Sequence, residues 1–266
     1  MDLAFLLAIL ATSFCLSYFV LPAIINKMIK AGIVGHDVNK LDKREVAEMG
    51  GLAVVIGLMG SLLLALALHT FFGYSLNQTE LTAALLTMTL IALIGTFDDL
   101  FDMRKDVKTL LPMIAALPLI SVAGSSFISL PFVGDVDFGI IYIVILIPLG
   151  VTVASNLTNM LAGFNGMEAG MGIVMFSAVA VIAVMRGEME SALIAVAMVG
   201  SLLAFLRLNW YPAKVFMGDV GTLLIGGALA VVVVIGKFEV VGFILVIPYL
   251  IDFFIKAVNR FPSKDW

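Results

Sequence analysis

Residues 140–170 read IIYIVILIPLGVTVASNLTNMLAGFNGMEAG, an apolar run followed by a polar, glycine-rich stretch. The apolar run covers residues 140–158, and a helix of about 20 such residues crosses the hydrocarbon core of a bilayer. The polar stretch, Asn156–Gly170, therefore lies at or just inside a membrane boundary. Its polar side chains of interest are Asn156, Asn159, Asn165 and Glu168.

Polar groups at that depth need partners, so a functional site is the first hypothesis. Amide carbonyl oxygens and carboxylates suit Mg²⁺ and the polar groups of a substrate. A polar loop between helices, whose amides bond to backbone carbonyls, explains the same residues without a function. This stretch alone leaves the two interpretations equally open.

The composition excludes an ordinary soluble domain. Hydrophobic residues make up 62% of the chain, whereas about half is usual for a soluble protein. Charged residues make up 13%, too few to cover a surface that faces water. The single cysteine, Cys15, rules out a disulfide framework. We therefore expect a polytopic membrane protein.

The apolar runs are continuous rather than alternating, which predicts an all-α protein and not a barrel. We expect nine membrane spans, with an error of about one. They lie at residues 3–26, 50–72, 81–97, 109–123, 140–158, 171–185, 191–206, 220–236 and 238–256.

The basic residues predict the orientation. Thirteen of the fifteen Lys and Arg fall in the loops after the odd-numbered spans and in the C-terminal tail, and the other two are Arg186 and Lys237. The positive-inside rule then places those loops in the cytoplasm and the N-terminus outside. The main polar clusters share that side: Gly35–Lys40, Asp98–Lys108, Asn156–Gly170 and Asn209–Asp219. A transporter should instead place its polar groups near the middle of the membrane.

The pair Asp98-Asp99 directly follows an apolar run, and Lys108 opens the next one. Adjacent carboxylates can bind a divalent metal, or one can act as a base while the other binds a cation. Lys108 is a point charge suited to phosphate. A solvated helix end with ordinary interfacial charges is the alternative.

The cluster Asn209–Asp219 ends at Asp219, which opens an apolar run and could cap the N-terminus of that helix. The functional alternative is a metal ligand that completes a site with Asn159. Phe216 could stack on a nucleobase or could anchor the chain at the membrane surface.

The first loop, Gly35–Met49, could cover a nucleotide, but a solvated basic loop is preferred. Asp252 and Lys256, spaced four apart, predict a local ion pair.

Four motifs together resemble the polyprenyl-phosphate N-acetylhexosamine-1-phosphate transferase family. They are GHDVNK (35–40), FDDLFDMRKDVKTLLP (97–112), NLTNMLAGFNGMEAG (156–170) and NWYPAKVFMGDVG (209–221). Their wording most resembles the eukaryotic and archaeal branch, the UDP-N-acetylglucosamine–dolichyl-phosphate N-acetylglucosaminephosphotransferases. Their order is that of the family and their spacing is similar, and the resemblance extends over nearly the whole chain.

The resemblance implies a Mg²⁺-dependent membrane enzyme, with Mn²⁺ as an alternative metal. By analogy, Asn159 and Asp219 would bind the metal that bridges the diphosphate. Asp98 and Asp99 would organise or deprotonate the acceptor phosphate, and Lys108 would lie close to the phosphates.

The resemblance also implies the substrates. The enzyme would transfer N-acetylglucosamine 1-phosphate from UDP-GlcNAc to dolichyl or another polyprenyl phosphate, release UMP, and so begin lipid-linked oligosaccharide assembly for protein N-glycosylation. Asn165 and Phe216 would contact the uracil, with Glu168 and Asn156 in support. We expect an active site on the cytoplasmic side of an archaeal cell membrane or an endoplasmic reticulum membrane, no nucleic-acid partner, and a homodimer as one option.

The family usually has ten helices and a cytoplasmic loop after the ninth, with a His/Arg motif that clamps the pyrophosphate. We expect residues 1–266 to form a single transmembrane domain that lacks this loop and the last helix, because the sequence stops at Trp266, where the loop should begin, and Arg260 and Lys264 do not reproduce the motif. Either the sequence is a fragment of a longer protein or the clamp comes from elsewhere. The alternatives are a bacterial-type phospho-MurNAc-pentapeptide transferase, a flippase for lipid-linked sugars, and an inactive membrane scaffold.

Overall fold

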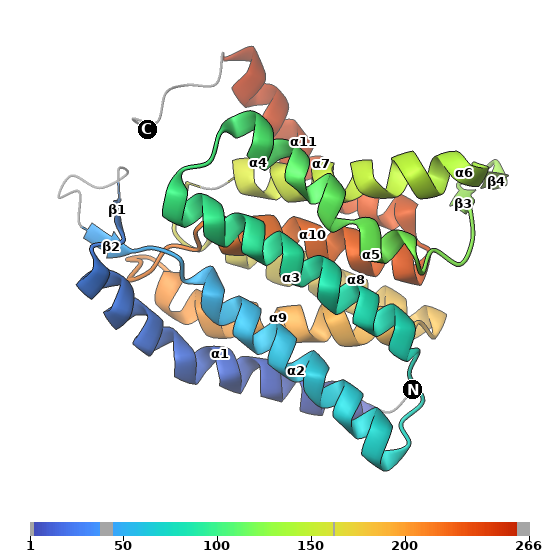
Figure 1. The fold of residues 1–266 in the computed structure, drawn as a ribbon, viewed down its shortest axis with the longest axis horizontal. Helices are drawn as coiled ribbons and strands as arrows, with labels where there is room; N and C mark the ends of the chain where they lie inside the picture. Colours follow the sequence, from blue (N-terminus) through green and yellow to red (C-terminus); the bar gives the residue numbers. More distant parts are fainter. Residues whose placement is uncertain (1–2, 38–44, 162, 260–266) are drawn as a thin grey trace.

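A computed structural model describes residues 3–37, 45–161 and 163–259 of the chain. The described part is a bundle of helices, and eight of them are long and apolar enough to cross a membrane (Figure 1). These eight are α1 (Leu3–Ala31), α2 (Gly51–Phe72), α3 (Gln78–Phe101), the continuous helix α6–η1–α7 (Gly139–Met160), α8 (Met167–Arg186), α9 (Met189–Asn209), α10 (Asp219–Gly236) and α11 (Glu239–Val258).

The predicted all-α membrane fold is confirmed, and the expected nine spans, with their error of about one, agree with these eight. The difference lies at residues 109–123, where the structure has two short helices, α4 (Lys105–Ala115) and α5 (Leu117–Ile120). Pro118 has no N–H to continue the helix, and its ring clashes with the carbonyl four residues earlier. A continuous spanning helix therefore does not form there.

A second difference concerns the end of α3, which is predicted at residue 97. The helix continues to Phe101, so Asp98 and Asp99 belong to its last turn. Asp102 then adopts a positive φ of 47°, and its N–H donates to the carbonyl of Asp98. The left-handed residue ends α3 and turns the chain toward α4.

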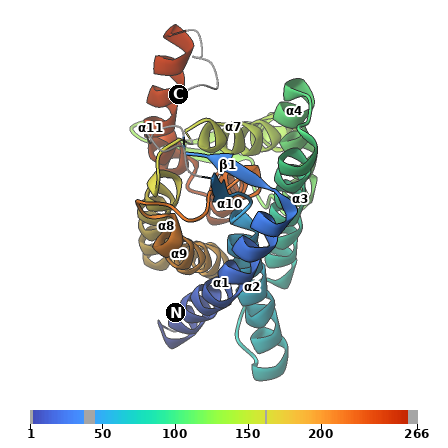
Figure 2. The same ribbon diagram turned by 90° about the vertical axis from the view of Figure 1, so that its left-hand side faces the viewer.

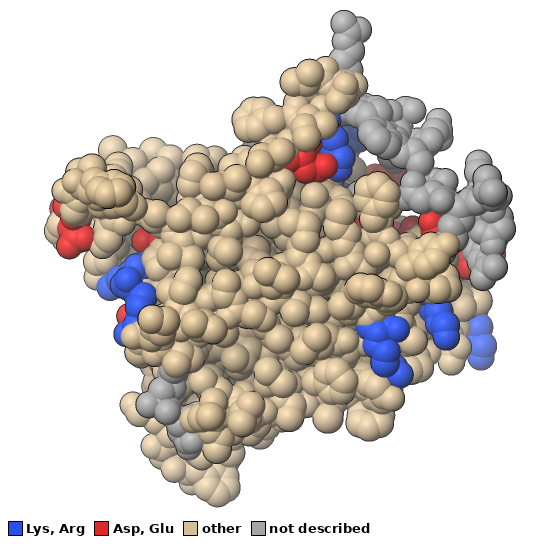
Figure 3. Space-filling view, turned by 180° about the vertical axis from the view of Figure 1, so that it is seen from behind, with Lys and Arg blue, Asp and Glu red and all other residues tan. Residues whose placement is uncertain are grey.

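Two short antiparallel hairpins lie at opposite ends of the bundle (Figure 1). The strands β1 (Val34–His36) and β2 (Glu45–Ala47) pair Val34 with Ala47. At the other end, β3 (Phe127–Leu130) pairs with β4 (Gly134–Asp137). On the face shown in Figure 3, the surface between the two ends of the bundle is almost free of charged side chains. Such a belt is what a membrane-spanning protein presents to lipid.

The helix α10 lies at the centre of the bundle, surrounded by α2, α3, α7, α8, α9 and α11 (Figure 2). In its most apolar window 89% of the residues are buried, against 17% for α11. Its sequence, DVGTLLIGGALAVVVVIG, is apolar on every face, as expected for a helix that is buried among other helices.

Glycines on α10 allow neighbouring helices to approach closely. A Cβ built on Gly226 would lie 2.1 Å from the carbonyl oxygen of Ala154 on α7. On another face, a Cβ on Gly51 of α2 would lie 2.5 Å from the Cα of Gly221. Small residues at such crossings are how membrane helices gain contact area, because lipid supplies no hydrophobic driving force between them.

The close crossing of α7 and α10 predicts the effect of one added methyl group. Gly226→Ala should lower the unfolding temperature in detergent by several degrees, since over-packing costs about 1–3 kcal/mol. Gly150→Ala on α7 is the matched control, because nothing lies within 4 Å of its Cβ position. Equal unfolding temperatures for the two variants would contradict this packing.

Candidate active site

The predicted site residues come from the ends of four helices that meet at the β1–β2 end of the bundle (Figure 2). Asp98 and Asp99 end α3, Asn159 ends α7, Glu168 begins α8 and Asp219 begins α10. Lys108 lies in the first turn of α4, and Asn165 and Phe216 lie in the loops that precede α8 and α10. Segments far apart in the sequence therefore form one polar region.

A lysine joins two carboxylates at the centre of this region. The Nζ of Lys108 donates to Oδ2 of Asp98 at 2.6 Å and also to Oδ2 of Asp219. The backbone N–H of Met103 donates to the other oxygen of Asp98 at 3.0 Å, which fixes that carboxylate against the turn after α3. Burial lowers the pKa of Lys108, but the two carboxylates raise it more, so the net pKa lies above the ordinary value. The lysine is therefore charged at neutral pH.

Asp99 has a different role from its neighbour. Its Oδ1 accepts the N–H of Asp219 at 2.7 Å, and its Oδ2 accepts the N–H of Val220 at 3.0 Å. The N-cap residue of α10, Gly218, has no side chain to do this. The carboxylate that caps α10 thus comes from α3. The sequence makes Asp219 a candidate for this capping role, but in the structure Asp99 fills it.

Asn159 completes the surroundings of Asp219. Its amide nitrogen donates to Oδ1 of Asp219 at 2.6 Å and to the hydroxyl of Thr222 at 2.9 Å. The predicted metal ligands Asn159 and Asp219 are therefore in direct contact. Asp219 contacts Lys108 with one oxygen and Asn159 with the other.

A polar cavity of about 290 Å³ lies beside this cluster, and Asp219 forms part of its wall. Asn165, Glu168 and Phe216, all predicted to serve the nucleotide, also line it. The backbone of Phe216 is fixed on both sides, since its N–H donates to Ala47 and its carbonyl accepts from Gly50.

Glu168 and Asn156, which are predicted to support the uracil site, both form hydrogen bonds with the protein backbone. Glu168 accepts the N–H of Gly163 at 3.1 Å and so closes the loop that precedes its own helix. Asn156 donates to the carbonyls of Thr109 on α4, at 3.1 Å, and Thr152, at 2.8 Å. Asn156 does not line the polar cavity and instead ties α7 to α4, next to Lys108.

The first loop contributes more to the cavity than its sequence indicates. His36, Asp37 and Glu48 line the wall, and Asp37 accepts a hydrogen bond from the amide of Asn165 at 3.1 Å. The sequence of this loop favours a solvated loop, and only the resemblance carried by its GHDVNK motif indicates a role at the site. Residues 38–44 of this loop lie outside the described part of the chain, as do Arg260 and Lys264.

The donor set can be tested against the Mg²⁺ that the resemblance implies. Within residues 3–37, 45–161 and 163–259, no three His, Cys, Asp or Glu side chains are grouped to hold a metal ion. One carboxylate, Asp219, and one amide, Asn159, lie together instead. Such a pair fits Mg²⁺, which usually binds one or two protein carboxylates and completes its shell with water and substrate phosphates.

These features define a class: a polytopic membrane protein with an acidic, lysine-bridged site at one end of its bundle. The chain belongs to glycosyl transferase family 4, whose sequence pattern matches residues 81–237. It is therefore a transferase enzyme, and the resemblance found from its motifs is confirmed.

Named relatives agree with the family. A putative UDP-N-acetylglucosamine–dolichyl-phosphate N-acetylglucosaminephosphotransferase of Saccharolobus solfataricus is 40% identical over 99% of this chain and 81% of its own length. The Dictyostelium discoideum protein of the same name is 25% identical over 92% of this chain and 70% of its own length. A phospho-N-acetylmuramoyl-pentapeptide-transferase of Halalkalibacterium halodurans is 30% identical over 76% of this chain and 65% of its own length.

The half-buried Glu48 generates a prediction about pH. Burial raises the pKa of Glu48, so its contribution to stability is present below its ordinary pKa of 4.5 and is lost as pH rises through the higher folded value. Glu48→Gln should therefore raise the unfolding temperature at about pH 7, and the gain should shrink as the pH falls toward 4.5.

Thermal unfolding in detergent at several pH values measures this effect. Glu45→Gln, on the exposed end of β2, is the matched control and should change little. A gain from Glu48→Gln that is the same at every pH would contradict the burial effect.

Proposed function

We propose that this protein transfers N-acetylglucosamine 1-phosphate from UDP-GlcNAc to dolichyl or another polyprenyl phosphate, with UMP as the second product. The observation that carries the proposal is the contact of Lys108 with Asp98 and Asp219 beside a polar cavity lined by Asn165 and Phe216. The names of the archaeal and Dictyostelium relatives support the two substrates. The reaction would be the first step of lipid-linked oligosaccharide assembly.

The chemistry requires little beyond positioning and charge neutralisation. An oxygen of the acceptor phosphate attacks the phosphorus that carries the sugar, and the bond from that phosphorus to the UMP oxygen breaks. Lys108 would neutralise charge on the phosphates. Mg²⁺, bound by Asn159 and Asp219, would supply further neutralisation of the diphosphate.

The two adjacent carboxylates are suited to different tasks. Both oxygens of Asp99 accept backbone N–H groups of α10, so its part is to position Asp219. Asp98 contacts Lys108 directly and is the better placed to orient the acceptor phosphate or accept its proton. Direct attack by the acceptor phosphate is a simpler route than transfer through an aspartyl-phosphate. The carboxylate of Asp98 already accepts hydrogen bonds from Lys108 and from a backbone N–H, which makes it less available as a nucleophile.

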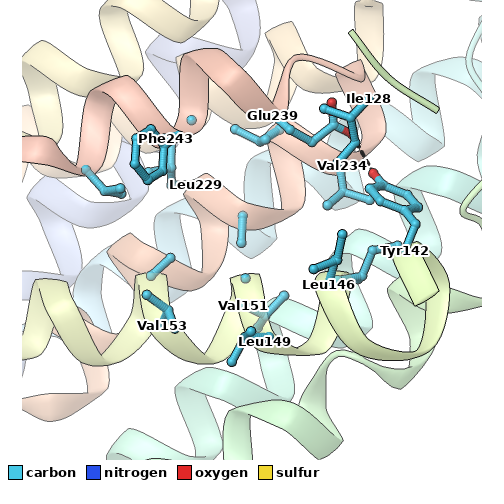
Figure 4. Close-up of a pocket in the computed structure, with 17 residues that line it drawn as sticks. Ile128, Tyr142, Leu146, Leu149, Val151, Val153, Leu229, Val234, Glu239 and Phe243 are labelled. Atoms are coloured by element: carbon cyan, nitrogen blue, oxygen red, sulfur yellow. Dashed lines mark hydrogen bonds between the residues drawn. The ribbon is translucent and has the colours of Figure 1, made fainter. Parts of the chain in front are cut away.

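An apolar cavity supports a lipid acceptor. It has a volume of about 520 Å³ and lies between α7, α10 and α11, with Leu149, Val153 and Phe243 in its wall (Figure 4). These three side chains are also exposed on the outside of the bundle, so the cavity is continuous with the surface that faces lipid. From Ala154 in its wall to Asn159 is about 7.5 Å along α7. An isoprenoid chain there would have its phosphate within reach of the polar site.

The cavity ends in a polar contact, where Tyr142 donates to Glu239 at 2.5 Å (Figure 4). The polar site lies toward the other end of α7, at the same end of the bundle as the exposed basic residues Lys27, Lys30 and Lys214. Under the positive-inside rule, this supports an active site that faces the cytoplasm.

Transfer of labelled N-acetylglucosamine 1-phosphate to a polyprenyl phosphate, with and without Mg²⁺, tests the function. Product that depends on Mg²⁺ is expected. The bacterial relative makes UDP-MurNAc-pentapeptide a second donor to try, since its name carries that sugar. Product only from the second donor would replace the proposed substrate, and product from neither would refute the proposed activity.

The metal assignment predicts the behaviour of Asp219→Asn. This variant should lose Mg²⁺-dependent turnover by orders of magnitude, because an amide is a weaker ligand than a carboxylate and cannot balance Lys108. Asp106→Asn is the control, since Asp106 is exposed and pairs with Arg104, which is exposed as well. Full turnover by Asp219→Asn would exclude Asp219 as a metal ligand.

The stacking assignment predicts the behaviour of Phe216→Ala. A base–aromatic stack is worth about 1–3 kcal/mol, so the KM for the nucleotide sugar should rise about 5- to 150-fold. The KM for polyprenyl phosphate should stay near the wild-type value. Phe97→Ala, which removes an exposed ring at the end of α3, is the matched control. An unchanged nucleotide KM would make Phe216 a packing residue.

A further inference from the structure

The second half of α11 carries a polar stripe on a helix that otherwise faces lipid. Tyr249, Asp252 and Lys256 are spaced three and four residues apart and so share one face. Tyr249 is buried, whereas Ile251 and Phe254, on other faces, are more than half exposed. The predicted ion pair is present, with Lys256 Nζ 2.8 Å from Asp252 Oδ2.

The same lysine reaches a second helix. Its Nζ donates to the backbone carbonyl of Met160 at 2.5 Å. Met160 is the last residue of α7 and directly follows Asn159. A cation at the C-terminal end of a helix is favourable because the last carbonyls carry partial negative charge and lack partners within the helix. Lys256 therefore fixes the point at which α7 ends.

Lys256 also acts on the segment that follows. It interacts electrostatically with the carboxylate of Glu168, in the first turn of α8. That carboxylate accepts the N–H of Gly163, and the N–H of Gly166 donates to the buried amide of Asn209 at 2.9 Å. Three side chains thus hold the connection between α7 and α8. Lys256 binds Met160 before it, Glu168 binds Gly163 within it, and Asn209 binds Gly166 at its end. Asn165, which lines the polar cavity, lies within this connection.

We propose that Lys256, oriented by Asp252, is a positioning residue of the nucleotide site. It holds the end of α7 and the following loop so that Asn159 faces Asp219 and Asn165 faces the cavity. Lys256 does not line the cavity itself and acts through Met160 and Glu168. The inference rests on the proposed function, since it takes the cavity to be the nucleotide site.

Lys256→Met removes the charge and the donor but keeps the length of the side chain. UMP binding, measured by titration calorimetry in detergent, should weaken by up to about tenfold, because UMP must then order a loop that the charged hydrogen bond to Met160 no longer holds. In turnover, the KM for UDP-GlcNAc should rise similarly, and the KM for polyprenyl phosphate should change less than twofold. Lys256→Arg should restore most of the affinity, because it keeps a donor and a charge.

Lys30→Met is the matched control. Lys30 also lies in the last turn of a helix at the same end of the bundle, and it is exposed. Its variant should bind UMP as the wild type does. Wild-type affinity in Lys256→Met, or no rescue by arginine, would overturn the positioning role.

Amide hydrogen exchange of the ligand-free protein separates this inference from the proposed function. Exchange across residues 163–166 should be faster in Lys256→Met and in Asp252→Asn than in the wild type, whatever the protein binds. Wild-type exchange rates in both variants would refute the positioning role. A wild-type protein that binds no UMP would refute the proposed nucleotide site, even if the exchange result is as expected.

Discussion

The capping of α10 by Asp99 is the interaction on which the site depends. The first N–H groups of α10 have no acceptor within the helix. Its N-cap residue, Gly218, has no side chain that could accept them. Asp99 reaches across from α3 and accepts two of them. Gly95, one turn earlier on α3, permits the approach, since a Cβ there would lie 2.5 Å from the carbonyl oxygen of Asp219. The position of Asp219 relative to Asp98 follows from this one contact.

Charge at the site is balanced within a short distance. Lys108 is only 18% exposed and lies between two carboxylates that would otherwise repel each other in a region of low polarity. Removing the lysine would leave two carboxylates without their cation, which is costly in a buried setting. Under the proposed function, a phosphate that binds Lys108 would compete with Asp98 and Asp219 for it. Under the proposed function, substrate binding would therefore draw on the same contacts that hold these three side chains together.

The sequence alone predicts most of the helices, because these depend on local composition. It also predicts that the motifs gather at one end of the bundle, because successive spans reverse direction and alternate loops therefore lie on the same side of the membrane. It does not predict that Asp98 and Asp99 face different partners, since that requires the register between α3 and α10. The break at Ala116 and the entry of Glu48 into the cavity also depend on packing. The pair Asp252 and Lys256 shows the same limit: spacing predicts their contact with each other but not the contact of Lys256 with Met160.

The contacts of the site differ in how early they can form during synthesis, and the cap of α10 by Asp99 can form only after a long delay. The two sides of this contact lie 120 residues apart, which at usual rates of translation is about 6–24 s. Asp98 and Lys108 are only 10 residues apart and can pair as soon as both have left the ribosome. The contact of Lys108 with Asp98 can therefore form before any residue of α10 exists. The contact of Lys108 with Asp219 has to form later, once the start of α10 has been synthesised.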